Sequence, residues 1–282
     1  MNGSRKFSFA CLLTALISVG TVTAQSNGSA SPIESGVAAP VSKRLKMPFK
    51  VGEVITYEGK LSKSIIRGIS VADLVFKLSA SPSSDDYVIN AEARSKGTLL
   101  KLFRFSFLQQ IDSTVDRDQF VTEKTIKVDV QKERIRNSEA LFDYSERRVT
   151  YVETDPNTPL NPPRIIASEI AGDTHDIVSA IYSLRMRPLA VGGSFVISVS
   201  DSGLVYDVPV RVTGRERIKT EIGNVWCFVV EPNLFGDGRM IEREGSMQIW
   251  ITDDARRLPV RGIVDASFGK LQINIKSVTE VK

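Results

Sequence analysis

Apolar and polar residues alternate with a period of two along most of the chain after residue 48, which is the pattern of half-buried β-strands. Turn-forming residues such as Asp201-Ser202-Gly203 fall between the alternating runs. Short connections of this kind favour antiparallel neighbours. We therefore predict a mainly β protein in which a large, twisted antiparallel sheet curls into an incomplete barrel. The most regular runs are residues 87–94, 125–130, 206–213 and 271–276.

Two of these runs carry more specific expectations. Over residues 125–130, an apolar face of Ile126, Val128 and Val130 alternates with a polar face, which predicts that the apolar face packs on the core. The run 206–213 contains Pro209, which has no N–H to give to a neighbouring strand. That strand is therefore predicted to lie at an edge of the sheet or to carry a bulge at Pro209.

One segment has the period of a helix instead. After Asp173-Thr174, apolar residues recur at the spacing of one helix face from Ile177 to Leu184, and Pro188 ends the run. The spacing predicts a helix over 174–187, packed against the inner face of the curled sheet. A weaker helical pattern covers residues 98–102.

The ends and the middle of the chain predict its organisation. Residues 1–24 have a basic start, a short apolar run and the small-residue site Val22-Thr23-Ala24, which together indicate a secretory signal cleaved after Ala24 and hence a periplasmic or exported protein. Residues 25–47 are rich in Ser, Gly, Ala and Pro and predict a disordered tether. Residues 48–282 form the single β-rich domain, in which the proline-rich stretch 155–166 predicts an irregular connection between a front half, 48–154, and a back half, 167–282.

The composition of the chain argues against several classes of partner and cofactor. The formal net charge is +4, and it falls to +2 without Arg5 and Lys6 of the signal, which argues against a nucleic-acid partner. One histidine, His175, and one cysteine beyond the signal, Cys227, argue against a zinc site and a disulfide framework, so we expect no metal and no cofactor. Cys227 lies in an apolar strand and is predicted to be a buried thiol. No second long apolar run predicts a membrane span after signal cleavage.

Three segments resemble one protein family. They are the opening Pro48 to Tyr57, the helix His175 to Arg185, and the closing stretch Ile249 to Val260. Together with Gly193 and the stretch Gly214 to Pro232, their order and spacing resemble domain of unknown function 3108. The resemblance implies an exported, β-rich bacterial envelope protein with no assigned reaction. The positions that carry it as motif residues are Gly52, Glu53, Tyr57, Asp176, Arg185, Gly193, Asp254, Arg257 and Pro259.

Several candidate catalytic or metal sites have simpler structural interpretations. His175 beside Asp176 could form an acid/base pair, but Asp176 at a helix start is more typical of a capping residue beside a solvated histidine. Adjacent carboxylates at Asp253-Asp254 rarely converge on one ion, and a hairpin turn pinned by an Asp–Arg pair explains them. Gly68 to Ala72 superficially matches a nucleophile elbow, but the strand-turn-helix context is missing. We therefore expect no catalytic site and a protein that is not an enzyme.

Two further features point to surfaces. The basic group Lys124, Lys127, Lys132, Arg134 and Arg136 could contact anionic headgroups, but interleaved acidic residues favour a solvated face. The most apolar stretch beyond the signal runs from Leu99 to Leu108 and predicts either a core segment or part of a ligand-binding wall. The candidate ligand contacts in it are Leu99, Leu102, Phe103, Phe105 and Phe107.

These observations lead to one expected function and two alternatives. The expected protein is a non-catalytic periplasmic protein that binds a lipid, another apolar or amphipathic ligand, or an envelope component in a concave β face. The first alternative is an interaction or scaffold module that binds an envelope protein partner. The second is a hydrolase that uses His175 and Asp176.

Overall fold

The computed structural model describes residues 47–279 of the 282-residue chain. The expected signal over 1–24 and all of the expected tether except Met47 lie outside the described residues. The front half contains β1 (Val54–Lys63), β2 (Ile66–Ala80), β3 (Tyr87–Ser95), α1 (Gly97–Phe103), β4 (Phe107–Val115), β5 (Thr122–Gln131), β6 (Arg134–Asp143), β7 (Arg148–Thr154) and β8 (Arg164–Glu169). The back half contains β9 (Thr174–His175), α2 (Ile177–Met186), β10 (Ser194–Asp201), β11 (Leu204–Thr220), β12 (Gly223–Pro232), β13 (Gly245–Thr252), β14 (Pro259–Ala266) and β15 (Gly269–Thr279).

All fifteen strands of the described chain belong to one sheet, in the order β8-β7-β6-β5-β4-β3-β2-β1-β15-β14-β13-β12-β11-β10-β9. Neighbouring strands are antiparallel except for the short parallel pair β9 and β10. The first and last strands, β1 and β15, pair with each other in the middle of the sheet. Because β8 and β9 at the two ends are not joined, the sheet is an open, incomplete barrel, which confirms the predicted fold class.

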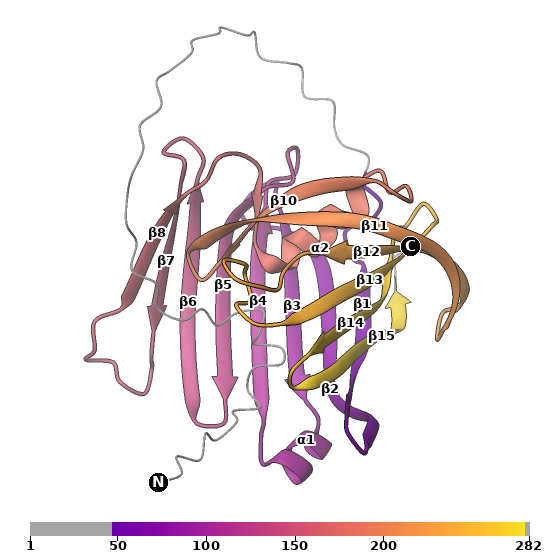
Figure 1. Ribbon diagram of the computed structural model, residues 1–282. Coiled ribbons are helices and arrows are strands. Elements are labelled where there is room, and N and C mark those ends of the chain that lie inside the picture. The colour runs from indigo at the N-terminus through magenta and orange to yellow at the C-terminus, as the bar shows by residue number, and fades with distance from the viewer. Residues whose placement is uncertain (1–46, 280–282) are drawn as a thin grey trace, which may run out of the picture.

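The sheet curls over so that its back half covers part of its front half. In Figure 1, β3 to β8 run side by side, β10 to β13 cross in front of them, and α2 lies between the two layers. The helix contacts β3 and β4 on one side and β9 and β10 on the other. The tip of the β10–β11 hairpin reaches the opposite end of the sheet, where a Cβ on Gly203 would lie 2.7 Å from Cβ of Tyr151 in β7.

The predicted helices are present, with shifted ends. Helix α2 begins at Ile177 rather than at residue 174 because Thr174 and His175 pair with β10 as β9. Asp176 is its N-cap, and its Oδ1 accepts a hydrogen bond of 2.7 Å from the backbone N–H of Ser179. The weaker pattern over 98–102 corresponds to α1. Neither helix of the described chain is long and apolar enough to cross a membrane.

The structure refines two predictions about prolines. The stretch 155–166 is not irregular throughout, because its last proline is Pro163 and β8 begins at Arg164. Strand β11 is not an edge of the whole sheet and has no bulge at Pro209, but Pro209 lies in the part of β11 that pairs with β10 alone, because the ladder with β12 begins at Val210. The carbonyl of Pro209 accepts a bond from Asn233 N–H just beyond the end of β12. The N and C=O of one residue point to the same side of an antiparallel strand, so the nitrogen of Pro209 points to the β12 side. On that side the pairing of β11 with β12 has already ended, so the missing N–H of the proline costs no ladder hydrogen bond.

Candidate ligand-binding cavity

A cavity of about 150 Å³ lies between α2 and the concave face of the sheet. It exists because the inward positions of β1, β2, β3 and β15 carry apolar side chains, and one face of α2 covers them without filling the space. Apolar residues predominate in its lining, including Ile55, Tyr57, Leu74, Phe76, Ala91, Ala93, Ile111, Ile177, Val178, Ile181, Met247, Ile249, Val264, Leu271 and Ile273.

Two polar groups in this lining have no partner. The Nε2 of Gln109 and the hydroxyl of Tyr182 are buried and make no hydrogen bond within the described chain. Burial raises the pKa of Tyr182, so the group stays a neutral hydroxyl. An unpaired buried polar group costs roughly 1–3 kcal/mol, so both groups would gain from a ligand or an ordered water.

A buried ion pair fixes one end of the cavity. The guanidinium of Arg185 in α2 binds both carboxylate oxygens of Glu53 at 2.5 and 2.8 Å, and both side chains are almost fully buried. Arg185 also donates to the carbonyl of Arg256 at 3.0 Å and lies 5.0 Å from the ring centroid of Phe49. The pair thereby joins α2 to the segment before β1 and to the turn before β14.

Five of the nine family-motif residues, Gly52, Glu53, Tyr57, Arg185 and Pro259, lie at or near this ion pair. Tyr57 lines the cavity, and its hydroxyl donates to the carbonyl of Pro259 at 2.9 Å. Burial raises the pKa of Tyr57 well above its usual range. Gly52 has a φ of +92°, and its N–H donates to the carbonyl of Leu78, which sets the chain direction just before Glu53. Three segments far apart in sequence therefore build one end of the site.

A smaller space of about 40 Å³ adjoins the cavity, and we call it the polar chamber. It shares Ile111 and Ile177 with the cavity, so the two spaces lie side by side. Its polar lining consists of Thr125, Lys127, Ser138, Asp176, Ser200, Asp201 and Ser202.

Asp201 is the unsatisfied group of the polar chamber. Its side chain is buried at the tip of the β10–β11 hairpin, and its Oδ2 has no hydrogen-bond partner in the described chain. Its Oδ1 accepts a bond of 3.3 Å from the Ser202 hydroxyl. Burial raises the pKa of Asp201 to about 6, against a smaller opposing effect of Lys127. The sequence predicts Asp201 in a turn. No local pattern predicts that the tip of this hairpin is buried against β7.

The polar chamber continues a polar inner face on β5, contrary to the predicted orientation of that strand. Asp129 and Gln131 are buried, whereas Ile126 of the apolar face is 43% exposed. Gln131 donates to Asp129 at 3.0 Å, and Arg134 donates to the same carboxylate at 2.7 Å. Side-chain partners thus make it possible to bury the polar face of this strand.

The five predicted ligand contacts lie outside the cavity lining. Leu99 and Phe105 are buried in the core beneath α1, and Phe103 and Phe107 are partly buried against the same cluster. Leu102 is 53% exposed. The stretch therefore packs at the far end of the core from the ion pair, and its role in ligand binding stays a prediction that the position of the cavity does not support.

The expectation of a solvated His175 is wrong. The side chain is 4% exposed, and its ring lies 6.2 Å from that of Phe120. Burial, with a smaller effect of Arg187, lowers the pKa of His175 to about 4. The Asp176 carboxylate binds Ser179 N–H and the Thr125 hydroxyl instead of the imidazole. Within residues 47–279 the Nδ1 of His175 has no hydrogen-bond partner, so the hydrolase alternative lacks the paired geometry that it needs.

The other sequence candidates have structural roles. Asp254 caps the turn after β13 by accepting bonds from Thr252 Oγ1 and the N–H of Arg256 and Arg257. Asp253 pairs with Arg257 at 3.4 Å, as the predicted Asp–Arg turn requires.

The remaining candidates also have structural roles, Ser70 and Cys227 within strands and Gly193 just before β10. Ser70 lies within β2 and donates to Glu58 at 2.7 Å, so no elbow forms. Cys227 is buried, and burial raises its pKa to about 12. Gly193 lies against the Ala190 carbonyl, which a Cβ would approach to 2.9 Å.

The basic group is largely neutralised by ion pairs. Lys124 binds Glu139 at 3.0 Å, Arg134 binds Asp129, and Arg136 binds Asp155. Lys132 lies 6.0 Å from the ring centroid of Phe105. Lys127 faces the polar chamber. The group therefore does not form one uniformly basic surface.

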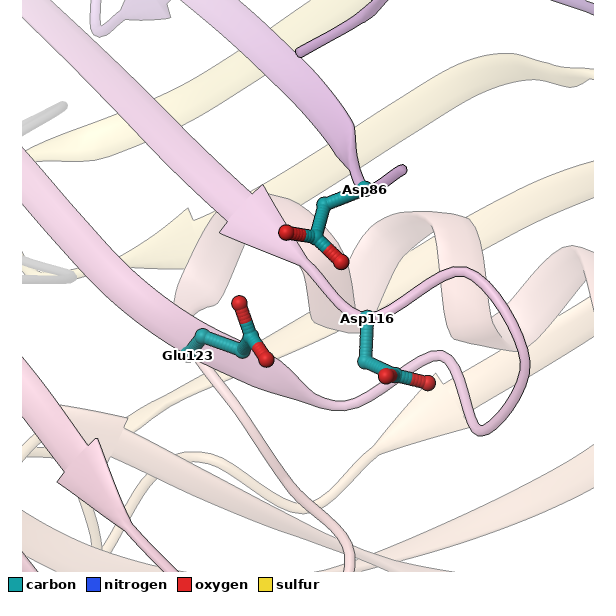
Figure 2. A group of neighbouring side chains, drawn as sticks. All are labelled: Asp86, Asp116 and Glu123. Atoms are coloured by element: carbon teal, nitrogen blue, oxygen red, sulfur yellow. The ribbon is translucent and has the colours of Figure 1, made fainter. Parts of the chain in front are cut away.

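A separate cluster of carboxylates lies where β3, β4 and β5 meet. Figure 2 shows Asp86, Asp116 and Glu123 close to one another, with one oxygen of each within 4.8 Å of the others. Such a set could hold a hard cation through oxygen ligands. Burial and the two neighbouring aspartates raise the pKa of Glu123, and Asp116 already accepts two backbone N–H bonds in its own loop. Sequence reasoning missed this cluster because its members belong to three separate segments of the chain.

Comparison with solved structures defines the class of protein. The chain resembles the crystal structure of a β-barrel-like protein with domain of unknown function 1849 from Brucella abortus, at 12% identity and a TM-score of 0.54, over 82% of this chain and 98% of that one. This likeness shows an open, barrel-like β fold. A family model described as protein of unknown function (DUF3108) matches residues 54–276, and the chain belongs to that family, as the motif residues predicted.

Other comparisons add little to the fold. A presumed exported protein with a YmcC-like fold from Bacteroides fragilis matches at 11% identity and a TM-score of 0.32, over 84% of this chain and 100% of that one. A presumed lipoprotein from Parabacteroides distasonis matches at 10% identity and a TM-score of 0.31, over 83% and 97%. No curated protein matches the chain.

Proposed function

We propose that the protein is an exported, non-catalytic binding protein that holds an apolar or amphipathic ligand in the cavity between α2 and the concave sheet. The observation that carries this proposal is a buried, largely apolar space with two unpartnered polar groups, Gln109 Nε2 and Tyr182 OH. Export rests on the secretory pattern of residues 1–24.

The size of the cavity limits the ligand. Drug-sized ligand sites span roughly 300–1,000 Å³, and an apolar cavity near 150 Å³ holds a molecule the size of benzene. A single alkyl chain or one small ring system fits a cavity of about 150 Å³, with any remainder extending toward its opening. A ligand with several bulky chains does not.

A fluorescent apolar probe tests this proposal. N-phenyl-1-naphthylamine, whose emission rises in an apolar environment, should bind the purified protein with one of its ring systems in the cavity and the other toward the opening, and should lose at least ten-fold in affinity when Ala93→Phe fills the cavity. Ala93 lines the cavity and is buried, whereas Ala167 on β8 is exposed. Ala167→Phe is therefore the matched control and should bind as the wild type does.

Folding of the variants must be checked separately. Overpacking by Ala93→Phe costs about 1–3 kcal/mol, so far-UV circular dichroism is recorded for each variant. Ala91→Leu, a smaller change at a second lining position, should give an intermediate loss of affinity. A folded Ala93→Phe protein with wild-type affinity, or a wild type that does not bind the probe, would contradict the proposal.

A further inference from the structure

We propose that the polar chamber receives the polar end of the same ligand, and that this end is a compact hydrogen-bond donor, an ammonium or a hydroxyl group, bound by Asp201. This inference rests on the proposed function and specifies the chemical class of its ligand. The ligand is then a single-chain amphipath with its chain under α2 and its head beside the β10–β11 hairpin.

The first support is the placement of the two spaces. Ile177 at the start of α2 and Ile111 on β4 line both the cavity and the polar chamber. The two spaces therefore border the same two side chains. The lining changes across these two isoleucines from aliphatic side chains to hydroxyls and charges, which is the profile that an amphipath requires.

The second support is the unpartnered carboxylate oxygen. Asp201 is 6% exposed and lines the chamber, and its Oδ2 has no donor among residues 47–279. Its Oδ1 is already bound by the Ser202 hydroxyl, so the missing partner is a single donor. A buried carboxylate oxygen is an acceptor only, and it gains most from a charged or hydroxyl donor.

The charges around the chamber favour a cation over an anion. Two carboxylates, Asp176 and Asp201, and one ammonium, Lys127, line it, and the guanidinium of Arg164 on β8 also acts electrostatically on the Asp201 carboxylate. Asp176 has its oxygens bound by Ser179 N–H and Thr125 Oγ1. Among the described residues no ion pair within 4.0 Å joins Lys127 to Asp201, so the Asp201 carboxylate is left for another cation. A carboxylate or phosphate head would meet two like charges.

The size of the chamber points to the same class. Its volume of about 40 Å³ is roughly a quarter of the cavity's volume of about 150 Å³. An ammonium or hydroxyl group is about as large as a water molecule, whereas a phosphate group is several times larger. The chamber therefore suits a compact head better than a phosphodiester.

Three probes with one chain and different heads test the inference. Octylamine, octanol and octanoate are titrated against bound N-phenyl-1-naphthylamine at about pH 8, where Asp201 and octanoate are ionised and octylamine is protonated. The affinity should fall in the order octylamine, octanol, octanoate, with at least ten-fold between the first and the last. Asp201→Asn should lower octylamine affinity at least ten-fold and leave octanol within about two-fold.

Two further variants distinguish a specific effect of charge in the polar chamber from a general effect of substitution on the protein. Lys127→Gln removes the competing cation and should tighten octylamine binding by about three-fold. Asp265→Asn, which neutralises an exposed carboxylate outside the chamber, should change nothing. If N-phenyl-1-naphthylamine itself does not bind, the proposed function fails. If it binds but the three octyl probes displace it equally, or if Asp201→Asn keeps the wild-type order, only the present inference fails.

Discussion

The inner face of the sheet has two parts of opposite character. Around β1, β2 and β15 the inward residues are apolar and enclose a cavity, as Ile55, Leu74 and Leu271 illustrate. On β5 the inward residues are polar, and Asp129 and Gln131 are more buried than Ile126 on the outer face. The contrast shows that burial in this fold follows the curl of the sheet, and that polar residues inside it are tolerated where side-chain partners exist.

The largest effect should come from breaking the buried ion pair at the apolar end. Glu53→Gln leaves the Arg185 guanidinium buried without a counter-charge, which should lower the free energy of unfolding by about 3–5 kcal/mol. Urea denaturation measures the change. The control is Arg94→Met, which breaks an exposed pair with Glu92 and should cost less than about 1 kcal/mol. Equal effects of the two substitutions would show that the Glu53–Arg185 pair does not hold α2 in place.

Truncation of apolar side chains compares the two parts directly. Leu271 is 1% exposed and lines the cavity, so Leu271→Ala should lower the free energy of unfolding by about 2–4 kcal/mol. Ile126→Ala on β5 should cost less than about 1 kcal/mol, because Ile126 faces outward. The same urea series measures both. A larger loss at Ile126 than at Leu271 would reverse the assigned orientation of β5.

Two buried groups, His175 and Asp201, should change the stability of the protein with pH in opposite directions. His175 has a folded pKa of about 4 against 6.5 in the unfolded chain, so between these values only the unfolded state binds the proton. Acidification through this window should cost up to about 3 kcal/mol, and the cost should disappear in His175→Gln.

Asp201 should act in the other direction. Its folded pKa of about 6 exceeds the ordinary value of 3.8, so the folded state holds the proton more tightly and acidification through this window stabilises it. Asp201→Asn should remove that gain, of up to about 3 kcal/mol. Unfolding curves at several pH values for both variants measure the two effects. A wild-type slope retained in both would mean that neither group is buried as described.

The smallest effect is expected on the polar inner face near solvent. Arg134→Met removes the Arg134 bond to Asp129, but the arginine side chain is 48% exposed and Gln131 still donates to the same carboxylate. The expected loss is below about 1 kcal/mol in urea denaturation. A loss of unfolding free energy close to that of Glu53→Gln would show that the Arg134–Asp129 bond contributes as much to stability as the buried Glu53–Arg185 pair.

Sequence reasoning predicted the fold class and the helix because both depend on local periodicity. Asp176 could be recognised as a capping residue for the same reason, and the motif residues Glu53 and Arg185 could be recognised from their order along the chain. The face of β5 could not be predicted, because local alternation does not show the contacts that bury its polar side chains. Thr125 and Lys127 face the polar chamber together with Asp201, and Asp129 is bound by Gln131 and Arg134.

The candidate site could not be predicted from local periodicity either, because it forms from segments far apart in the sequence. The cavity is made of residues from eight elements, and Asp201 becomes a buried acceptor only when its hairpin tip packs against Tyr151. Leu99 to Leu108 is the most apolar stretch beyond the expected signal, yet apolar character alone does not distinguish packed core from a ligand-binding wall.

The central claim is that one amphipathic molecule spans the apolar cavity and the polar chamber. A crystal structure of the protein with octylamine tests it most directly. The account predicts the alkyl chain beneath α2, between Ile55 and Ile181, and the amine nitrogen within hydrogen-bond distance of Asp201 Oδ2. An octylamine molecule bound elsewhere on the surface, or an amine end turned away from Asp201, would contradict it.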